Sequence, residues 1–301
     1  MRKVINLFFL LSLIFLTGCM NELTLPTNSD DKNDTLPVLG TNPNELIEVN
    51  FLNAPIFIDL KSQTQIYLPP TINDYEIKWK YDDAIFNFTN HLLSVKNDGK
   101  TTLAATVQNE KYIYTETFSF VIKNQKIIQS RQHGLVFHYN FLPQNNKKVG
   151  KTFIPQMIVF HNTANSASAY NEIRYLHSQD NTSSTSFHYA VDDIGIYQAI
   201  PTTNYAHHAG NLAINQKSIG IEIAKSTIND PIIKDIAIQN AIKLISLLMF
   251  NYLIEHDDVI THQMASGKLC PHDILNHYGL EKFYQDLRQE NALYKDYVAF
   301  D

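Results

Sequence analysis

The sequence predicts an α/β domain with a mixed sheet covered by helices, preceded by a small all-β sandwich. Three observations lead to this prediction. The chain has 301 residues, enough for two domains at roughly 100–200 residues each. Short runs of β-branched and aromatic residues fill residues 45–124, whereas strand patterns alternate with helix patterns after residue 130. Hydrophobic residues make up 44% of the chain, so both parts can bury a core.

The N-terminal residues predict export and lipid attachment. Arg2 and Lys3 precede an apolar run of 13 residues (4–16), which is shorter than the roughly 20 residues that cross a bilayer. We therefore expect residues 1–18 to be a signal peptide. The sequence Leu-Thr-Gly-Cys ending at Cys19 resembles the lipobox of bacterial lipoproteins, in which the cysteine is acylated; an ordinary signal peptide is the alternative. Acylation would anchor the chain in the cell envelope, on the periplasmic or cell-surface side of the membrane.

The next two segments differ sharply in composition. Residues 19–44 are rich in Asn, Asp, Thr and Pro and contain few large apolar residues, so we expect a flexible tether. Residues 45–124 contain strand-like runs separated by turn signals at roughly 8–12-residue spacing, which predicts an immunoglobulin-like β sandwich. The predicted strands cover residues 56–58, 65–68, 76–81, 102–107 and 112–122. No motif in this part indicates a ligand, so it is interpreted as a spacer or binding module.

Residues 130–301 have the pattern of an α/β domain. A serine N-cap opens a short predicted helix, and Pro231 stands in the first turn of a long one, where proline is tolerated. The long helix has apolar residues at helical spacing on one side. The predicted strands cover 157–160, 186–191, 195–200 and 218–224, and the predicted helices cover 166–178 and 231–256.

Three candidate metal ligands follow predicted strands. His161 comes directly after the apolar strand 157–160, at the carboxyl edge where α/β proteins build their sites, although a hydrogen-bonded edge histidine is the alternative. His262 follows a second strand-like segment, and Cys270 lies eight residues further on. If Cys19 is acylated, Cys270 has no disulfide partner within the chain, which leaves an intermolecular disulfide, a buried inert thiol, a nucleophile or a metal ligand. Imidazole and thiolate are ligands that zinc prefers, and only this choice explains the neighbouring histidines.

Five motifs, in order, resemble the N-acetylmuramoyl-L-alanine amidase family of zinc enzymes over roughly residues 133–285. They are His161-Asn162-Thr163, Ser186-Phe187-His188-Tyr189, Ala206-His207-His208-Ala209-Gly210, Ser218-Ile219-Gly220-Ile221-Glu222, and Thr261-His262-Gln263 leading to Cys270-Pro271-His272. The resemblance implies an amidase domain over residues 130–301, with Zn²⁺ as its cofactor. It also implies peptidoglycan as the substrate, cut between N-acetylmuramic acid and L-alanine.

The resemblance further assigns roles to individual residues. It places the metal on His161, His262 and Cys270. It places Glu222 beside the zinc-bound water as a general base, and Lys268 where it can stabilise the oxyanion of the attacked carbonyl. His208 matches a motif that lines the substrate groove. His188 is expected to bind substrate, with a buried position in its strand as the alternative.

Alternatives remain for single residues and for the whole chain. Glu222 alternates with apolar isoleucines and shares its face with small residues, which indicates a site rather than a solvent-facing carboxylate; Lys268 could be an ordinary solvated loop charge. A non-catalytic peptidoglycan-recognition module would use the same groove. An adhesin or structural lipoprotein acting through its β part would leave the His and Cys cluster unexplained. The net charge of −6 and the lack of a long basic run predict no nucleic-acid partner.

Overall fold

The structure of the protein is a computed structural model, and it describes residues 55–110, 113–225 and 230–295. The predicted signal peptide (1–18), the predicted tether (19–44) and Cys19 lie outside the described residues. Within the described ranges, no helix combines the length and the apolar character that a membrane span requires.

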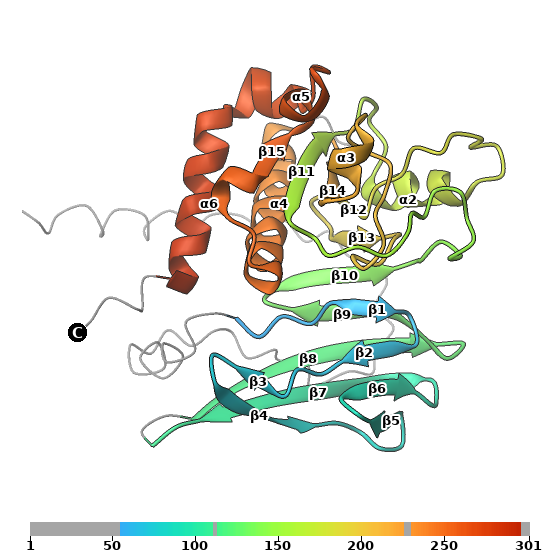
Figure 1. The fold of residues 1–301 in the computed structure, drawn as a ribbon, viewed down its shortest axis with the longest axis vertical. Coiled ribbons are helices and arrows are strands. Elements are labelled where there is room, and N and C mark those ends of the chain that lie inside the picture. The colour runs from blue at the N-terminus through green and yellow to red at the C-terminus, as the bar shows by residue number, and fades with distance from the viewer. Residues whose placement is uncertain (1–54, 111–112, 226–229, 296–301) are drawn as a thin grey trace, which may run out of the picture. The chain divides into compact units, whose positions relative to one another are not determined.

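The described strands form two sheets (Figure 1). One has four strands in the order β1-β2-β6-β5, and the other has eleven in the order β15-β11-β14-β12-β13-β10-β9-β8-β7-β4-β3. The strands are β1 (Leu60–Ser62), β2 (Gln65–Tyr67), β3 (Thr71–Ile72), β4 (Tyr75–Lys80), β5 (Phe86–Thr89), β6 (Leu92–Val95), β7 (Gly99–Gln108), β8 (Ile113–Lys123), β9 (Lys126–Gln132), β10 (Leu135–Tyr139), β11 (Met157–Asn162), β12 (Tyr189–Val191), β13 (Ile196–Gln198), β14 (Ser218–Ile223) and β15 (Val259–Thr261). The helices are α2 (Ala169–His177), α3 (Leu212–Asn215), α4 (Pro231–Tyr252), α5 (His262–Ser266) and α6 (Leu280–Lys295), with short turns η2 (His256–Asp258) and η3 (Ile274–Tyr278).

The N-terminal part consists of strands, several of which bury alternate residues. Strand β8 buries Phe118, Phe120 and Ile122, which lie two residues apart on one face. The ring of Phe86, from the four-stranded sheet, meets Phe120 edge-on with centroids 6.3 Å apart. The two sheets therefore share one apolar core, while an immunoglobulin-like arrangement of their strands stays a prediction. Residues 56–58, expected to be a strand, are buried without being paired in either sheet.

The large sheet continues from the N-terminal strands into the α/β part. Strand β10 pairs antiparallel with β9 on one side and parallel with β13 on the other. The boundary expected between residues 124 and 130 falls at the β8–β9 hairpin, inside this sheet. The structure therefore differs from a division into two separate domains. Pairing explains the difference, because β9 covers an edge of β10 that would otherwise expose unpaired backbone groups.

A buried carboxylate also joins the two parts. Asp59 lies just before β1, and its side chain accepts hydrogen bonds from Tyr189, Thr202 and Tyr252, all in the α/β part. The Tyr189 and Tyr252 bonds measure 3.3 and 2.5 Å. A buried carboxylate is costly unless it is hydrogen-bonded, so this cluster ties the first strand to the second half of the chain.

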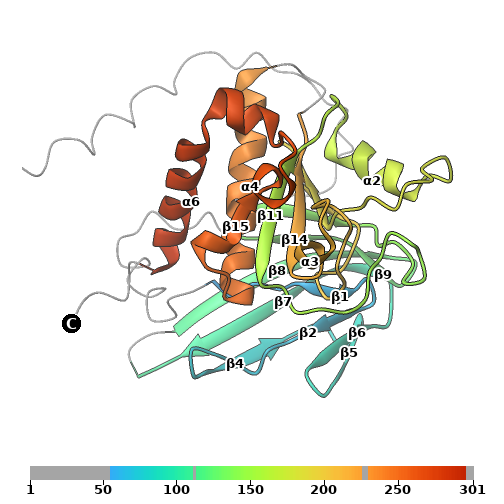
Figure 2. The same ribbon diagram turned by 45° about the horizontal axis from the view of Figure 1, so that its top comes forward.

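The two faces of the α/β sheet have different coverings (Figures 1 and 2). On one face, Ile158, Phe160 and Ile221 pack into the core that includes α4 and α6. The rings of Phe160 and Phe283 stack with centroids 4.4 Å apart. Residues one position along the same strands point to the other face, where α2, α3 and α5 lie. The site is built on this second face.

The predicted helices start close to where the sequence placed them. Helix α4 begins at Pro231, and the side chain of Asp230 caps it by accepting a hydrogen bond from the N–H of Ile232. Helix α2 also has a serine N-cap, but the capping residue is Ser168 rather than Ser166.

Candidate metal centre

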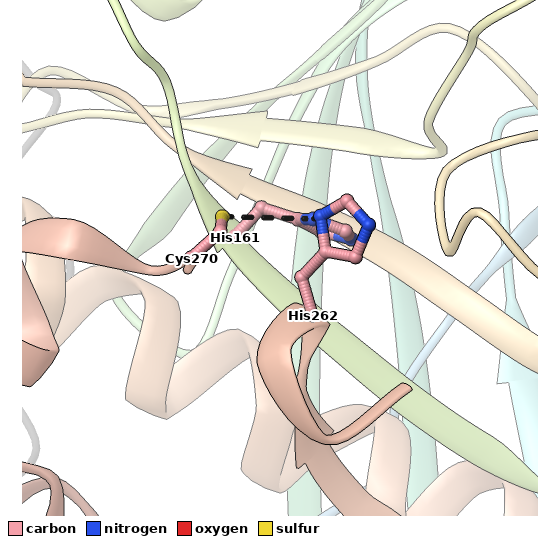
Figure 3. A group of neighbouring side chains, drawn as sticks. All are labelled: His161, His262 and Cys270. Atoms are coloured by element: carbon pink, nitrogen blue, oxygen red, sulfur yellow. Dashed lines mark hydrogen bonds between the residues drawn. The ribbon is translucent and has the colours of Figure 1, made fainter. Parts of the chain in front are cut away.

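The three predicted metal ligands converge at the carboxyl ends of β11 and β15 (Figure 3). His161 lies near the end of β11, His262 opens α5 directly after β15, and Cys270 follows the loop after α5. The Nδ1 atoms of the two histidines are 3.0 Å apart, and the Cys270 Sγ lies 4.0 Å from Nδ1 of His161. The ligand atoms of all three residues lie within 4.8 Å of one another. All three side chains are buried, with exposed fractions of 1%, 7% and 4%.

These distances and donor types fit a zinc ion. Tetrahedral zinc, with bonds of about 2.0–2.1 Å to nitrogen and about 2.3 Å to sulfur, holds its ligand atoms roughly 3.3–3.6 Å apart. The Nδ1–Nδ1 separation of 3.0 Å and the Nδ1–Sγ separation of 4.0 Å lie on either side of that range. Burial raises the pKa of the Cys270 thiol to about 11 and lowers the pKa of His161 well below its usual value. A bound cation would favour the thiolate and the neutral imidazole, the forms that ligate metals.

The segment that carries Cys270 is held against the end of β11. The side-chain oxygen of Asn162 accepts hydrogen bonds from the backbone N–H groups of Asp273 (3.0 Å) and Ile274 (3.3 Å). The carbonyl of Cys270 accepts a hydrogen bond of 2.9 Å from the N–H of Gln263. These bonds place the thiol beside His161. Sequence reasoning assigned Asn162 no role, although its position next to His161 in the first motif was a usable signal.

The two predicted substrate-binding histidines are both buried. His188 is 0% exposed, and its Nδ1 accepts a hydrogen bond from the N–H of Gly220 while its Nε2 lies 2.9 Å from the carbonyl of Asn204. His208 is 5% exposed and lies behind His161, with its Nδ1 3.2 Å from Nε2 of that ligand. Burial lowers the pKa to about 4 for His188 and about 3 for His208, so both rings are neutral. The buried position that was the alternative for His188 is what the structure shows, and substrate contact by either histidine stays a prediction.

Glu222 and Lys268 lie close enough to the candidate metal ligands for their charges to shift the pKa values of those ligands. Glu222 is half-buried and is the register partner of His161 on β14. Burial raises the pKa of Glu222 to about 8; the charge of Glu172 adds to this rise and the charge of Lys268 opposes it. Lys268 is exposed, and its charge also lowers the pKa of His161 and His262. A carboxylate with a pKa near neutrality and a nearby ammonium group suit proton transfer and oxyanion stabilisation.

Sequence reasoning also missed Glu172 on α2. Its side chain accepts a hydrogen bond of 2.7 Å from the amide of Asn165 and adds negative charge near Glu222. The residue belongs to none of the five motifs, so no local signal pointed to it.

Residues 150–273 match the sequence family described as N-acetylmuramoyl-L-alanine amidase, and this span contains the three candidate metal ligands, Glu222 and Lys268. This part of the chain belongs to that amidase family. The resemblance noted in the motifs is thereby confirmed for the amidase domain.

Individual relatives match the same region. The N-acetylmuramoyl-L-alanine amidase CwlA of Bacillus subtilis (strain 168) is 46% identical over 124 residues, which cover 40% of this chain and 44% of the relative. The N-acetylmuramoyl-L-alanine amidase XlyB of the same organism is 45% identical over 124 residues, covering 40% of this chain and 38% of the relative. The chain thus spans less than half the length of these two relatives. Among solved structures, the catalytic domain of XlyA is 35% identical, with 50% of this chain and 98% of that chain covered and a TM-score of 0.46.

Proposed function

We propose that this chain is a zinc-dependent amidase that hydrolyses the bond between N-acetylmuramic acid and L-alanine in peptidoglycan. The observation that carries the proposal is the convergence of His161, His262 and Cys270 beside a carboxylate whose pKa is raised to about 8. Three protein ligands leave a fourth tetrahedral position for water or substrate, as catalytic zinc sites do. Membership of the amidase domain in its family supports the reaction and the substrate class.

The residues of the chain divide the chemistry among them. Zinc, when bound, would supply a Lewis acid that polarises the amide carbonyl and lowers the pKa of water. Glu222 removes the proton from the attacking water and then donates that proton to the departing L-alanine amine. Lys268 stabilises the negative charge that develops on the carbonyl oxygen. Because Lys268 is on an exposed loop, its side chain can reach a polymer bound at the surface.

A non-catalytic recognition module is the main competing function. Such a module needs neither a general base nor an open metal position. The presence of Glu222 and Lys268 beside a complete set of three ligands favours hydrolysis.

We further propose that Cys19 is acylated, which would place the enzyme at the cell envelope and give it a membrane as a second partner. The support is the sequence alone: a basic start, a 13-residue apolar run and a lipobox-like ending. Metabolic labelling with a palmitate analogue should label the chain. A Cys19→Ala variant should lose the label and leave the membrane fraction, and an unchanged distribution would contradict the anchor.

The enzymatic proposal is tested by incubating the detergent-solubilised full chain with purified peptidoglycan, with zinc or with a chelator. New L-alanine amines and new reducing ends are quantified separately. We expect new amines without reducing ends, and no release in chelator. Zinc binding without amine release would indicate the recognition module instead.

A further inference from the structure

We propose that His208 is a positioning residue that holds the metal ligand His161 by accepting a hydrogen bond from it. This inference rests on the proposed zinc site and assigns His208 a role other than substrate contact. The Nε2 atom of His161 lies 3.2 Å from Nδ1 of His208, and the two rings are nearly perpendicular, at 88°. The other nitrogen of His161, Nδ1, faces the remaining two ligands.

Metal binding determines the direction of this hydrogen bond. A neutral imidazole carries one N–H, so a metal on Nδ1 of His161 requires the proton on Nε2. That N–H points at His208, whose Nδ1 must therefore be the acceptor. Metal-ligating histidines usually donate their second ring N–H to a fixed partner, which sets both the tautomer and the ring orientation.

The surroundings of His208 hold its ring in the matching tautomer. With Nδ1 accepting, the proton of His208 lies on Nε2, which faces the Ser218 carbonyl at 3.4 Å and the Ser218 hydroxyl oxygen at 3.3 Å. The Ser218 hydroxyl donates its own proton to the carbonyl of Ile214 at 2.7 Å, so its oxygen can only accept from His208. The chain of bonds from His161 through His208 to Ser218 thus runs in one direction.

The backbone and packing around His208 are equally specific. The side-chain oxygen of Asn215 accepts hydrogen bonds from the N–H groups of His208 (3.0 Å) and Ala209 (2.8 Å). The ring lies against Gly220 so closely that a Cβ there would come within 2.5 Å of Cγ of His208. The glycine of the Ser-Ile-Gly-Ile-Glu motif therefore provides the space that the His208 ring occupies.

Two variants of His208 separate the effect of the hydrogen bond on zinc affinity from the effect of side-chain size. His208→Ala removes the acceptor, and His208→Asn restores an oxygen near the position of Nδ1. The matched control is His207→Asn, which changes the neighbouring half-buried histidine. Zinc affinity is measured for each full-length variant by competition with a chromophoric chelator. We expect His208→Ala to weaken zinc binding roughly 10- to 100-fold, with most of the affinity kept in His208→Asn and all of it in the control.

Gly220→Ala supplies a second, independent change, because its methyl group must displace the His208 ring. We expect this variant to lose zinc affinity in the wild-type background. It should cause little further loss when combined with His208→Ala, since the ring that clashes is gone. Additive losses in this double-mutant cycle would contradict the inference.

The bond itself can be observed in the wild-type protein. In zinc-loaded protein with ¹⁵N-labelled histidines, a scalar coupling across the N–H···N bond should link Nε2 of His161 to Nδ1 of His208. No coupling, or unchanged zinc affinity in His208→Ala, would overturn the positioning role while leaving the proposed enzyme intact. Failure of the wild-type protein to bind zinc would instead refute the proposed function.

Discussion

His161 on β11 and Glu222 on β14 are register partners in neighbouring parallel strands. Residues paired in this way project from the same face of a sheet, so the first candidate metal ligand and the carboxylate share one surface. The residues one position earlier, Phe160 and Ile221, are also paired and fill the core on the opposite face. One strand pairing therefore separates the chemistry of the site from the packing that supports it.

Replacing Glu222 with Gln should abolish most hydrolysis and leave zinc bound. The amide cannot accept a proton from water, and general-base catalysis contributes roughly 10²- to 10⁴-fold, so we expect a loss of that size in amine release from peptidoglycan. Glu172→Gln is the matched control. It removes a carboxylate whose charge acts on Glu222, but Glu172 lies on α2 and is not paired with His161 as Glu222 is. Unaltered turnover in Glu222→Gln would show that another group is the base.

The same residue should make the stability of the metal-free protein depend on pH. Burial raises the folded-state pKa of Glu222 from 4.5 to about 8, so between these values the folded state holds a proton that the unfolded state releases. The free energy of unfolding should consequently fall as pH rises through this window. Urea unfolding in chelator at about pH 5 and about pH 8 checks this. Glu222→Gln should remove that part of the decrease, and parallel pH profiles for the two proteins would contradict the shifted pKa.

Zinc should stabilise the wild-type protein through Cys270. A metal that binds the folded state alone raises the melting temperature, and chelator should reverse that rise. Cys270→Ala lacks the thiolate and should melt at the same temperature with and without zinc. Cys270→Asp keeps an anionic ligand and should retain part of the effect. An equal zinc response in Cys270→Ala would exclude this residue as a ligand.

Asp59→Ala, a change in the N-terminal half of the chain, should lower the free energy of unfolding by removing an acceptor for side chains of the α/β part. Its removal leaves the buried hydroxyl of Tyr189 without its acceptor and takes one of two partners from the half-buried hydroxyl of Tyr252, which also contacts Thr202. A buried group left unsatisfied costs about 1–3 kcal/mol. Asp83→Ala, an exposed aspartate of the same strand region, should change the free energy of unfolding by less than about 0.5 kcal/mol. Urea titrations of both variants provide the comparison. Equal stability would mean that the cluster does not couple the two parts.

The sequence by itself predicted the three candidate metal ligands and the strand face that carries them. The alternation of Ile219, Ile221 and Ile223 with small residues reflects the period of two of a strand, which local sequence shows directly. His161, His262 and Cys270 could be named because each stands in a motif beside a strand end. Helix α4 was similarly evident from its apolar spacing and its first-turn proline.

Only the tertiary structure decided which distant segments meet. The burial of His208 behind His161, the hold of Asn162 on the Cys270 segment and the joining of both halves through β9 and β10 all depend on contacts far apart in sequence. A local pattern shows which face of an element is apolar, but not which other element will cover it. For that reason His208 could be placed near the site from its motif, whereas its position directly behind His161 required the folded chain.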